Sequence, residues 1–163
     1  MLYNRAPTGA DDMGSAPTER EYAREQDDTT FVMGVPGSGT PQRILIADDN
    51  PDTLSFMQAA LEKAGYEVQT APEGAQALAL LAKRRADLLI TDIFMPGHDG
   101  IETLRDCKAR FPQTRIIVMS AGGGSGRQLD YLPAAALIGA NATMRMPFNV
   151  DQLLDTVREV LQL

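Results

Sequence analysis

Two apolar runs in this sequence end in aspartate. The run Arg43–Ala47 is followed by Asp48 and Asp49, and the run Asp87–Thr91 is followed by Asp92. Short runs rich in Ile and Leu, separated by helix-like segments, are typical of parallel strands that are buried on both faces. Because the carboxyl ends of parallel strands meet at one edge of a sheet, we expect the three carboxylates to gather where open α/β sheets bind ligands.

Three neighbouring carboxylates repel one another and resist joint ionisation unless a cation lies among them. Oxygen ligands of this kind suit a hard divalent metal ion. A carboxylate held beside such an ion can also act as a nucleophile. The pattern therefore predicts a divalent cation next to a reactive aspartate.

The chain has 163 residues, enough for one ordinary domain and a tail, and 44% of its residues are hydrophobic. Its net charge of −7 is unevenly distributed. Residues 1–40 hold seven acidic and three basic side chains, and residues 41–163 hold fifteen and twelve. The second segment has no basic stripe, which argues against nucleic acid as a direct partner.

The single cysteine, Cys107, excludes an internal disulfide and a zinc site with several cysteine ligands. Its helix-like surroundings predict a small buried hydrophobe. No apolar stretch is long enough to cross a bilayer, and the acidic N-terminus does not resemble a targeting peptide. We therefore expect no membrane association and a cytoplasmic location.

Composition divides the chain into two parts. Residues 1–41 are rich in Gly, Pro, Ser, Thr, Asp and Glu and lack a sustained apolar period, which predicts a disordered acidic tail and linker. From residue 42 the pattern alternates strand and helix five times, which predicts a doubly wound α/β domain over 42–163. The expected strands are 43–48, 66–70, 87–92, 115–120 and 142–146, and the expected helices are 51–65, 72–84, 100–110, 129–139 and 150–163.

In this second part the chain resembles the receiver domain of two-component response regulators. The matching stretches are Ile44–Asn50, Leu89–Pro96 with Asp99-Gly100, Ile116–Ala121, and Gly139-Ala140 with Pro147-Phe148. They occur in order and at matching spacing across 43–163. The resemblance implies a flavodoxin-like, five-stranded parallel sheet of order 2-1-3-4-5 with five helices.

The resemblance also implies a metal site. Asp49 and Asp92, with the backbone carbonyl of Phe94, would bind Mg²⁺ directly, and Asp48 would reach it largely through water. Asp92 would be the phosphoacceptor. In-line attack on a phosphoryl group mainly needs positioning and charge neutralisation, and Mg²⁺ supplies much of the latter.

Two further residues receive roles from the same resemblance. Ser120 would donate its hydroxyl to a phosphoryl oxygen, and the small side chain of Ala121 would leave room for the phosphoryl group. The implied partner is a histidine kinase or a phosphotransfer protein. A downstream protein would dock on the face formed by the domain's fourth helix, fifth strand and fifth helix, with the chain a monomer or weak dimer.

Three departures from the family pattern accompany this match. Met146 stands where receivers normally have a lysine, and the adjacent Arg145 should point to the opposite face of its strand. Thr143 stands at the position of the usual switch aromatic, and it cannot swing a ring into a pocket. The glycine-rich stretch 121–126 is expected to be a flexible loop.

The resemblance and the departures from it suggest three functions. The first is a stand-alone receiver that accepts a phosphoryl group on Asp92 and signals through protein contacts, with at most slow self-hydrolysis and no other enzymatic turnover. The second is a receiver-like docking module that ignores phosphorylation, which Met146 and Thr143 suggest. The third, a metal-dependent phosphatase, requires a second acid two residues after its nucleophile, where Asn50 and Pro51 stand instead. We favour the first.

Overall fold

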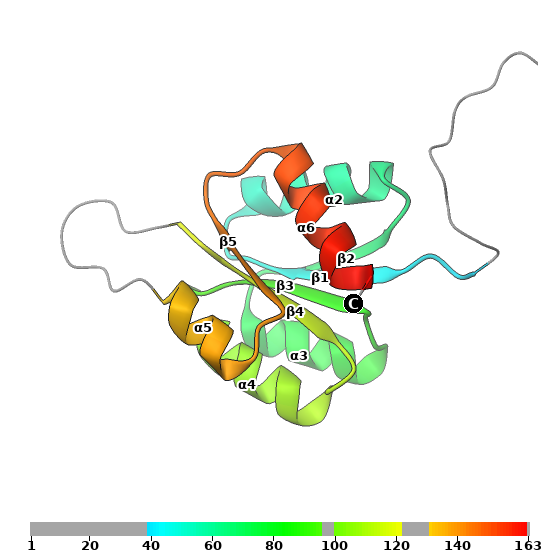
Figure 1. Ribbon diagram of the computed structural model, residues 1–163. Coiled ribbons are helices and arrows are strands. Elements are labelled where there is room, and N and C mark those ends of the chain that lie inside the picture. Colours follow the sequence, from blue (N-terminus) through cyan, green and yellow to red (C-terminus); the bar gives the residue numbers. More distant parts are fainter. Residues whose placement is uncertain (1–38, 96–99, 122–130, 163) are drawn as a thin grey trace, which may run out of the picture. The chain divides into compact units, whose positions relative to one another are not determined.

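The computed structural model describes residues 39–95, 100–121 and 131–162. Its strands are β1 (Arg43–Ala47), β2 (Glu67–Ala71), β3 (Leu88–Asp92), β4 (Arg115–Ser120) and β5 (Ala142–Arg145). Its helices are α2 (Pro51–Lys63), α3 (Gly74–Lys83), α4 (Gly100–Arg110), α5 (Leu132–Ile138) and α6 (Val150–Gln162). The strands form one parallel sheet of order β2-β1-β3-β4-β5, which confirms the predicted fold (Figure 1).

Helices cover both faces of the sheet. In Figure 1, α2 and α6 lie on one side of it, and α3, α4 and α5 lie on the other. Each layer has its own apolar core, because successive residues of a strand point to opposite faces. Ile44 and Ile46 of β1 pack toward α2 and α6, whereas Leu45 and Ala47 pack toward α3, α4 and α5. Central strands buried on both sides explain the continuous apolar runs of the sequence.

Local signals set the start and end of α2. The side-chain oxygen of Asn50 accepts hydrogen bonds from the backbone N–H groups of Asp52 (2.9 Å) and Thr53 (3.3 Å). Pro51 occupies the first turn, where its missing N–H costs nothing. After the helix, Gly65 adopts a φ of +94°, which favours glycine. The hydrogen bonds to Asn50 hold the chain directly after Asp48 and Asp49, at the carboxyl end of β1.

Two helix starts differ from the prediction. Helix α3 begins at Gly74 rather than Pro72, because Glu73 before it has an extended backbone. Helix α5 begins at Leu132, with Tyr131 as its N-cap, and residues 129 and 130 of the predicted span lie outside the described residues. Pro133 has no N–H to donate, so it is tolerated in the first turn but not four residues inside a helix.

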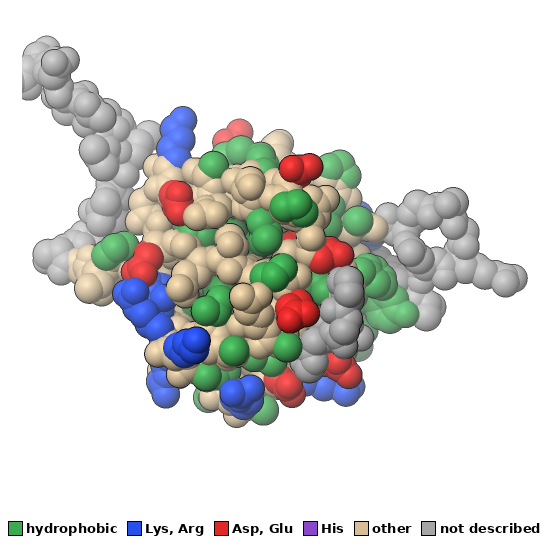
Figure 2. Space-filling model, turned by 180° about the vertical axis from the view of Figure 1, so that it is seen from behind, with side chains coloured by type: hydrophobic (Ala, Val, Ile, Leu, Met, Phe, Trp, Pro, Cys, Tyr) green, Lys and Arg blue, Asp and Glu red, His purple; other side chains and the backbone are tan. Residues whose placement is uncertain are grey.

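Other predictions have mixed outcomes. Cys107 is buried in α4, as expected, and burial raises the pKa of its thiol to about 11. Within the described residues no helix is long and apolar enough to cross a membrane. The face shown in Figure 2 mixes acidic, basic and apolar side chains. The predicted tail up to residue 38 and the glycine-rich loop from residue 122 lie outside the described residues and stay predictions.

Candidate acidic site at the carboxyl edge of the sheet

The structure brings the three predicted aspartates together. One carboxylate oxygen from each of Asp48, Asp49 and Asp92 lies within 4.8 Å of the others. Asp92 is the last residue of β3, and Asp48 and Asp49 directly follow β1, the neighbouring strand. The pairing of β1 with β3 therefore brings Asp92 close to Asp48 and Asp49, which lie more than 40 positions earlier in the chain.

The two inner carboxylates are buried and only partly hydrogen-bonded. Asp48 is 1% exposed and Asp92 is 7% exposed, whereas Asp49 is open to solvent. The Oδ1 atom of Asp48 accepts a hydrogen bond from the backbone N–H of Asn50 (2.8 Å). The Oδ2 atom of Asp48 and the Oδ1 atom of Asp92 are buried without a hydrogen-bond partner. Buried acceptors without partners are rare in native proteins, and a cation bound among these carboxylates would satisfy both atoms.

The pKa values of two of these aspartates are also raised. Burial and, after it, the neighbouring charge of Asp48 together raise the pKa of Asp92 to about 6. A backbone hydrogen bond from Phe94 opposes this rise. Burial also raises the pKa of Asp48, against the hydrogen bond from Asn50. Both shifts show that burial and the neighbouring carboxylates disfavour the ionised forms.

A hard divalent cation fits these residues. Such a cation binds carboxylate oxygens, and the two buried oxygens without partners belong to the cluster that would hold it. A cation would also counter the repulsion between the carboxylates, which adds to burial in raising both pKa values. The predicted contribution of the Phe94 carbonyl, like each residue's assigned role, stays a prediction.

Ser120 is the last residue of β4, the strand next to β3, and Ala121 directly follows it. Asp92 pairs in register with Met119 of β4, so Ser120 lies one residue beyond it toward the same edge of the sheet. Ser120 is 4% exposed, and Ala121 is exposed. The backbone oxygen of Ser120 accepts a hydrogen bond from the N–H of Met146 (2.8 Å), which fixes the segment after β5 beside it.

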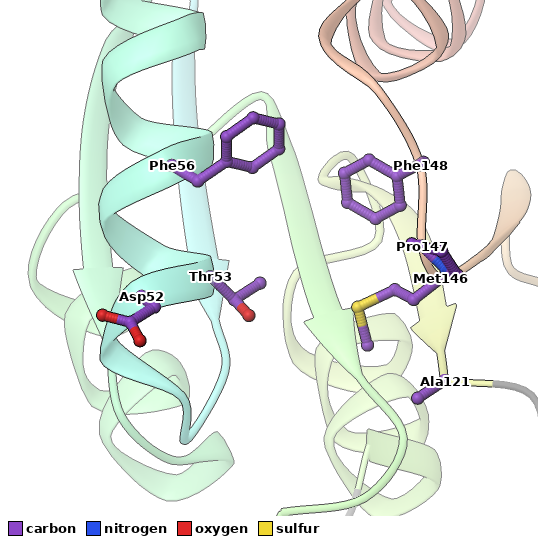
Figure 3. Close-up of a pocket in the computed structure, with 7 residues that line it drawn as sticks. All are labelled: Asp52, Thr53, Phe56, Ala121, Met146, Pro147 and Phe148. Atoms are coloured by element: carbon purple, nitrogen blue, oxygen red, sulfur yellow. The ribbon is translucent and has the colours of Figure 1, made fainter. Parts of the chain in front are cut away.

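Met146 faces a groove at this edge rather than the core. The groove has a volume of about 510 Å³, and its lining residues are Asp52, Thr53, Phe56, Ala121, Met146, Pro147 and Phe148. Figure 3 shows the Met146 thioether extending between α2 and the segment that leads into α6. The rings of Phe56 and Phe148 lie on opposite sides of the groove and are tilted by 43° to each other, with centroids 6.3 Å apart. The side chain that replaces the usual lysine therefore gives this groove an apolar wall.

Comparisons with known proteins agree with this geometry. A family model described as the response regulator receiver domain matches residues 44–158. The chain belongs to this family. Its receiver domain therefore places it among the proteins of two-component phosphorelay signalling, whose receivers are phosphoacceptors rather than ordinary enzymes.

Individual relatives of the receiver domain differ in length. The chain is 34% identical over 122 residues to sporulation initiation phosphotransferase F of Bacillus subtilis, covering 75% of this chain and 95% of that protein. It is 31% identical to the response regulator MprA of Mycobacterium sp. (strain KMS), but spans only 51% of that protein. The solved chemotaxis response regulator CheY4 of Vibrio cholerae is similar at a TM-score of 0.67 and 29% identity, covering 74% of this chain and 99% of that one.

Two aromatic contacts near the site could not be predicted from the sequence. One joins Phe56 and Phe148 across the groove, and the other joins Phe94 and Tyr131 beside Asp92. Each pair is separated by dozens of residues, so only the packing of the elements brings its members together. Gly100, by contrast, belongs to the Asp99-Gly100 motif that the sequence analysis singled out. Its N–H donates a hydrogen bond to the carbonyl oxygen of Ile93 (2.8 Å), the residue directly after Asp92.

Proposed function

We propose that Asp92 accepts a phosphoryl group from a phosphohistidine of a histidine kinase or phosphotransfer protein, and that the domain then signals through protein contacts. The observation that carries this proposal is the buried, partnerless Oδ1 of Asp92 within the three-carboxylate cluster. Membership of the receiver family supports it. The likeness to a relative named a phosphotransferase supports a role in passing phosphoryl groups between proteins.

The transfer is an in-line displacement. An ionised oxygen of Asp92 attacks phosphorus, and the new O–P bond forms as the N–P bond to the donor imidazole breaks. The electron pair of that bond stays on the imidazole nitrogen. Because the donor ring carries a proton on its other nitrogen, it leaves as a neutral histidine, and the second product is an aspartyl phosphate. With a pKa of about 6, Asp92 is mainly ionised at neutral pH and can act as the nucleophile.

The remaining site residues assist this step. Asp48, Asp49 and Asp92 would hold Mg²⁺, with the Phe94 carbonyl as a further ligand. When bound, the ion supplies positive charge that offsets the negative charge of the carboxylates and the phosphoryl group. Ser120 donates its hydroxyl to a phosphoryl oxygen from the neighbouring strand end.

Mass spectrometry of the intact protein tests the proposal. Incubation with acetyl phosphate and MgCl₂ should add the mass of one phosphoryl group to the wild type, and nothing to Asp92→Asn or to samples with EDTA. Asp87→Asn, which alters an exposed aspartate outside the cluster, should behave as wild type. No added mass in the wild type with acetyl phosphate or with a phosphorylated histidine donor would contradict the proposal.

A second candidate is a docking module that does not respond to phosphorylation. Two observations favour it: Met146 provides an apolar wall where a cation is usual, and Thr143 is exposed on β5 and carries no ring. In that case Asp92→Ala should bind a partner as tightly as the phosphorylated wild type. The first proposal instead predicts that the variant loses regulation of that binding.

A further inference from the structure

An aromatic contact lies directly beside the proposed phosphoacceptor. Phe94 follows Asp92 by two residues, and its backbone N–H hydrogen-bonds to the Asp92 carboxylate. Its ring is 42% exposed and therefore stands at the surface of the site rather than in the core. Phe94 thus presents a backbone donor to the Asp92 carboxylate and a ring to the surface.

Tyr131 holds that ring from another element. The rings of Phe94 and Tyr131 meet edge to face, with centroids 5.5 Å apart and planes at 79°. This is one of the preferred geometries for an aromatic pair, because the positive edge of one ring meets the negative face of the other. A T-shaped contact defines the position of both rings more sharply than burial alone does.

Tyr131 is in turn fixed by helix α5. It is the N-cap residue of that helix, and its carbonyl oxygen accepts a hydrogen bond from the N–H of Ala135 (2.9 Å). Leu132 and Ala135 of the first turn are buried in the core beneath the sheet, and Tyr131 packs against that core. A movement of Tyr131 therefore moves the start of α5.

We infer that Tyr131 is a positioning residue for phosphoryl transfer at Asp92, acting through the Phe94 ring and linking the site to helix α5. This inference rests on the proposed function. The chain of contacts runs from the Asp92 carboxylate to the Phe94 N–H, then to the Phe94 ring, the Tyr131 ring and the first turn of α5. Phosphorylation of Asp92 changes the charge of its carboxylate and the oxygen that accepts from the Phe94 N–H. Through the two rings, this change at the site shifts the first turn of α5. Thr143, exposed on β5, offers no ring for such a link.

Three variants separate the role of the ring from other roles of Tyr131. Tyr131→Phe keeps the aromatic edge and should behave as wild type. Tyr131→Leu keeps apolar bulk against the core but removes the ring contact. Leu137→Ala alters the same helix at a side chain that is 89% exposed, and it serves as the matched control.

The measurement is the amide NMR spectrum during titration with Mg²⁺ and beryllofluoride, an analogue of the bound phosphoryl group. In the wild type, Tyr131→Phe and Leu137→Ala, the Phe94, Leu132 and Ala135 amides should shift together. In Tyr131→Leu the Leu132 and Ala135 shifts should be lost, and the beryllofluoride dissociation constant should change by about 2- to 10-fold, the range of one aromatic contact.

The outcomes distinguish this inference from the proposed function. If the wild type shows no response to beryllofluoride, the proposed function fails, and the inference fails with it. If the wild type responds and Tyr131→Leu shows the same affinity and the same α5 shifts, only the inference is overturned. The inference would also be overturned if Tyr131→Phe lost the Leu132 and Ala135 shifts, because this variant keeps the ring contact. Thermal unfolding of each variant checks that it is folded.

Discussion

Gly100 lies against the backbone of Asp92 with no room for a side chain. A Cβ atom built on Gly100 would stand 2.1 Å from the carbonyl oxygen of Asp92 and 2.6 Å from the Cα of Ile93. Both contacts are with backbone, which cannot move aside as a flexible side chain can. Gly100 also begins α4, so this close approach sets how the helix leaves the site.

Gly100→Ala should therefore damage both the fold and the site. Forcing a methyl group into a filled space typically costs about 1–3 kcal/mol, and the immovable backbone puts this case at the upper end. We expect a lower free energy of unfolding in urea and weaker beryllofluoride binding. Gly65→Ala is the matched control, because its Cβ would meet no atom within 4 Å and its only penalty is the positive φ. Wild-type binding by Gly100→Ala would show that the backbone at Asp92 adapts without loss.

The pKa of Asp92 makes its contribution to stability depend on pH. Because the folded pKa of about 6 lies above the ordinary value of 3.8, the folded state binds more protons than the unfolded state in this interval. The free energy of unfolding should therefore fall as pH rises through that window. Without divalent cations, Asp92→Asn should gain stability relative to wild type between about pH 4 and pH 7, because it lacks this titration.

Urea unfolding of the wild type and Asp92→Asn at about pH 4 and pH 7 measures this difference in stability. Glu159→Gln, which removes an exposed carboxylate on α6, should show no such gain. Addition of Mg²⁺ at neutral pH should stabilise the wild type more than Asp92→Asn, since a ligand stabilises the state that binds it. A stability difference that is independent of pH would mean that Asp92 has an ordinary pKa.

Met146→Lys should strengthen the phosphorylated state. Met146 lines the groove next to Ala121, and its N–H bond to the Ser120 carbonyl keeps its backbone close to the end of β4. A charge-assisted hydrogen bond contributes about 1.5–3 kcal/mol, which corresponds to roughly 10- to 150-fold in affinity. Isothermal titration with beryllofluoride and Mg²⁺ measures the gain. Met146→Gln, polar but uncharged, should gain much less, and equal affinities for all three proteins would remove any role of charge at this position.

Asn50→Ala should destabilise the fold while leaving the acidic cluster in place. It removes the side-chain cap of α2, a loss of about 1 kcal/mol. The backbone N–H that donates to Asp48 remains in the alanine variant. Asn149→Ala removes the equivalent cap of α6, where Asn149 accepts from the N–H of Gln152 (2.8 Å), and it gives the matched comparison. If only Asn50→Ala weakens Mg²⁺ binding strongly, the capped loop itself holds the metal site in shape.

The carboxylate cluster and the sheet could be predicted from the sequence for the same physical reason. A residue that directly follows a buried strand is placed by the sheet, so Asp48, Asp49 and Asp92 had to meet once the apolar runs formed neighbouring parallel strands. Strand ends lie within one residue of those predicted, because alternation and apolar runs mark strands directly. The cap at Asn50 was equally local and equally predictable.

Contacts between helices and loops were decided only by the tertiary structure. Two features depend on which face each helix covers and how closely it packs: the apolar groove around Met146 and the ring contact between Phe94 and Tyr131. No local pattern encodes such distances, because they result from the combined packing of side chains far apart in the chain. The sequence determined where the acidic chemistry lies, and the packing of α2, α5 and the segment after β5 decided what surrounds it.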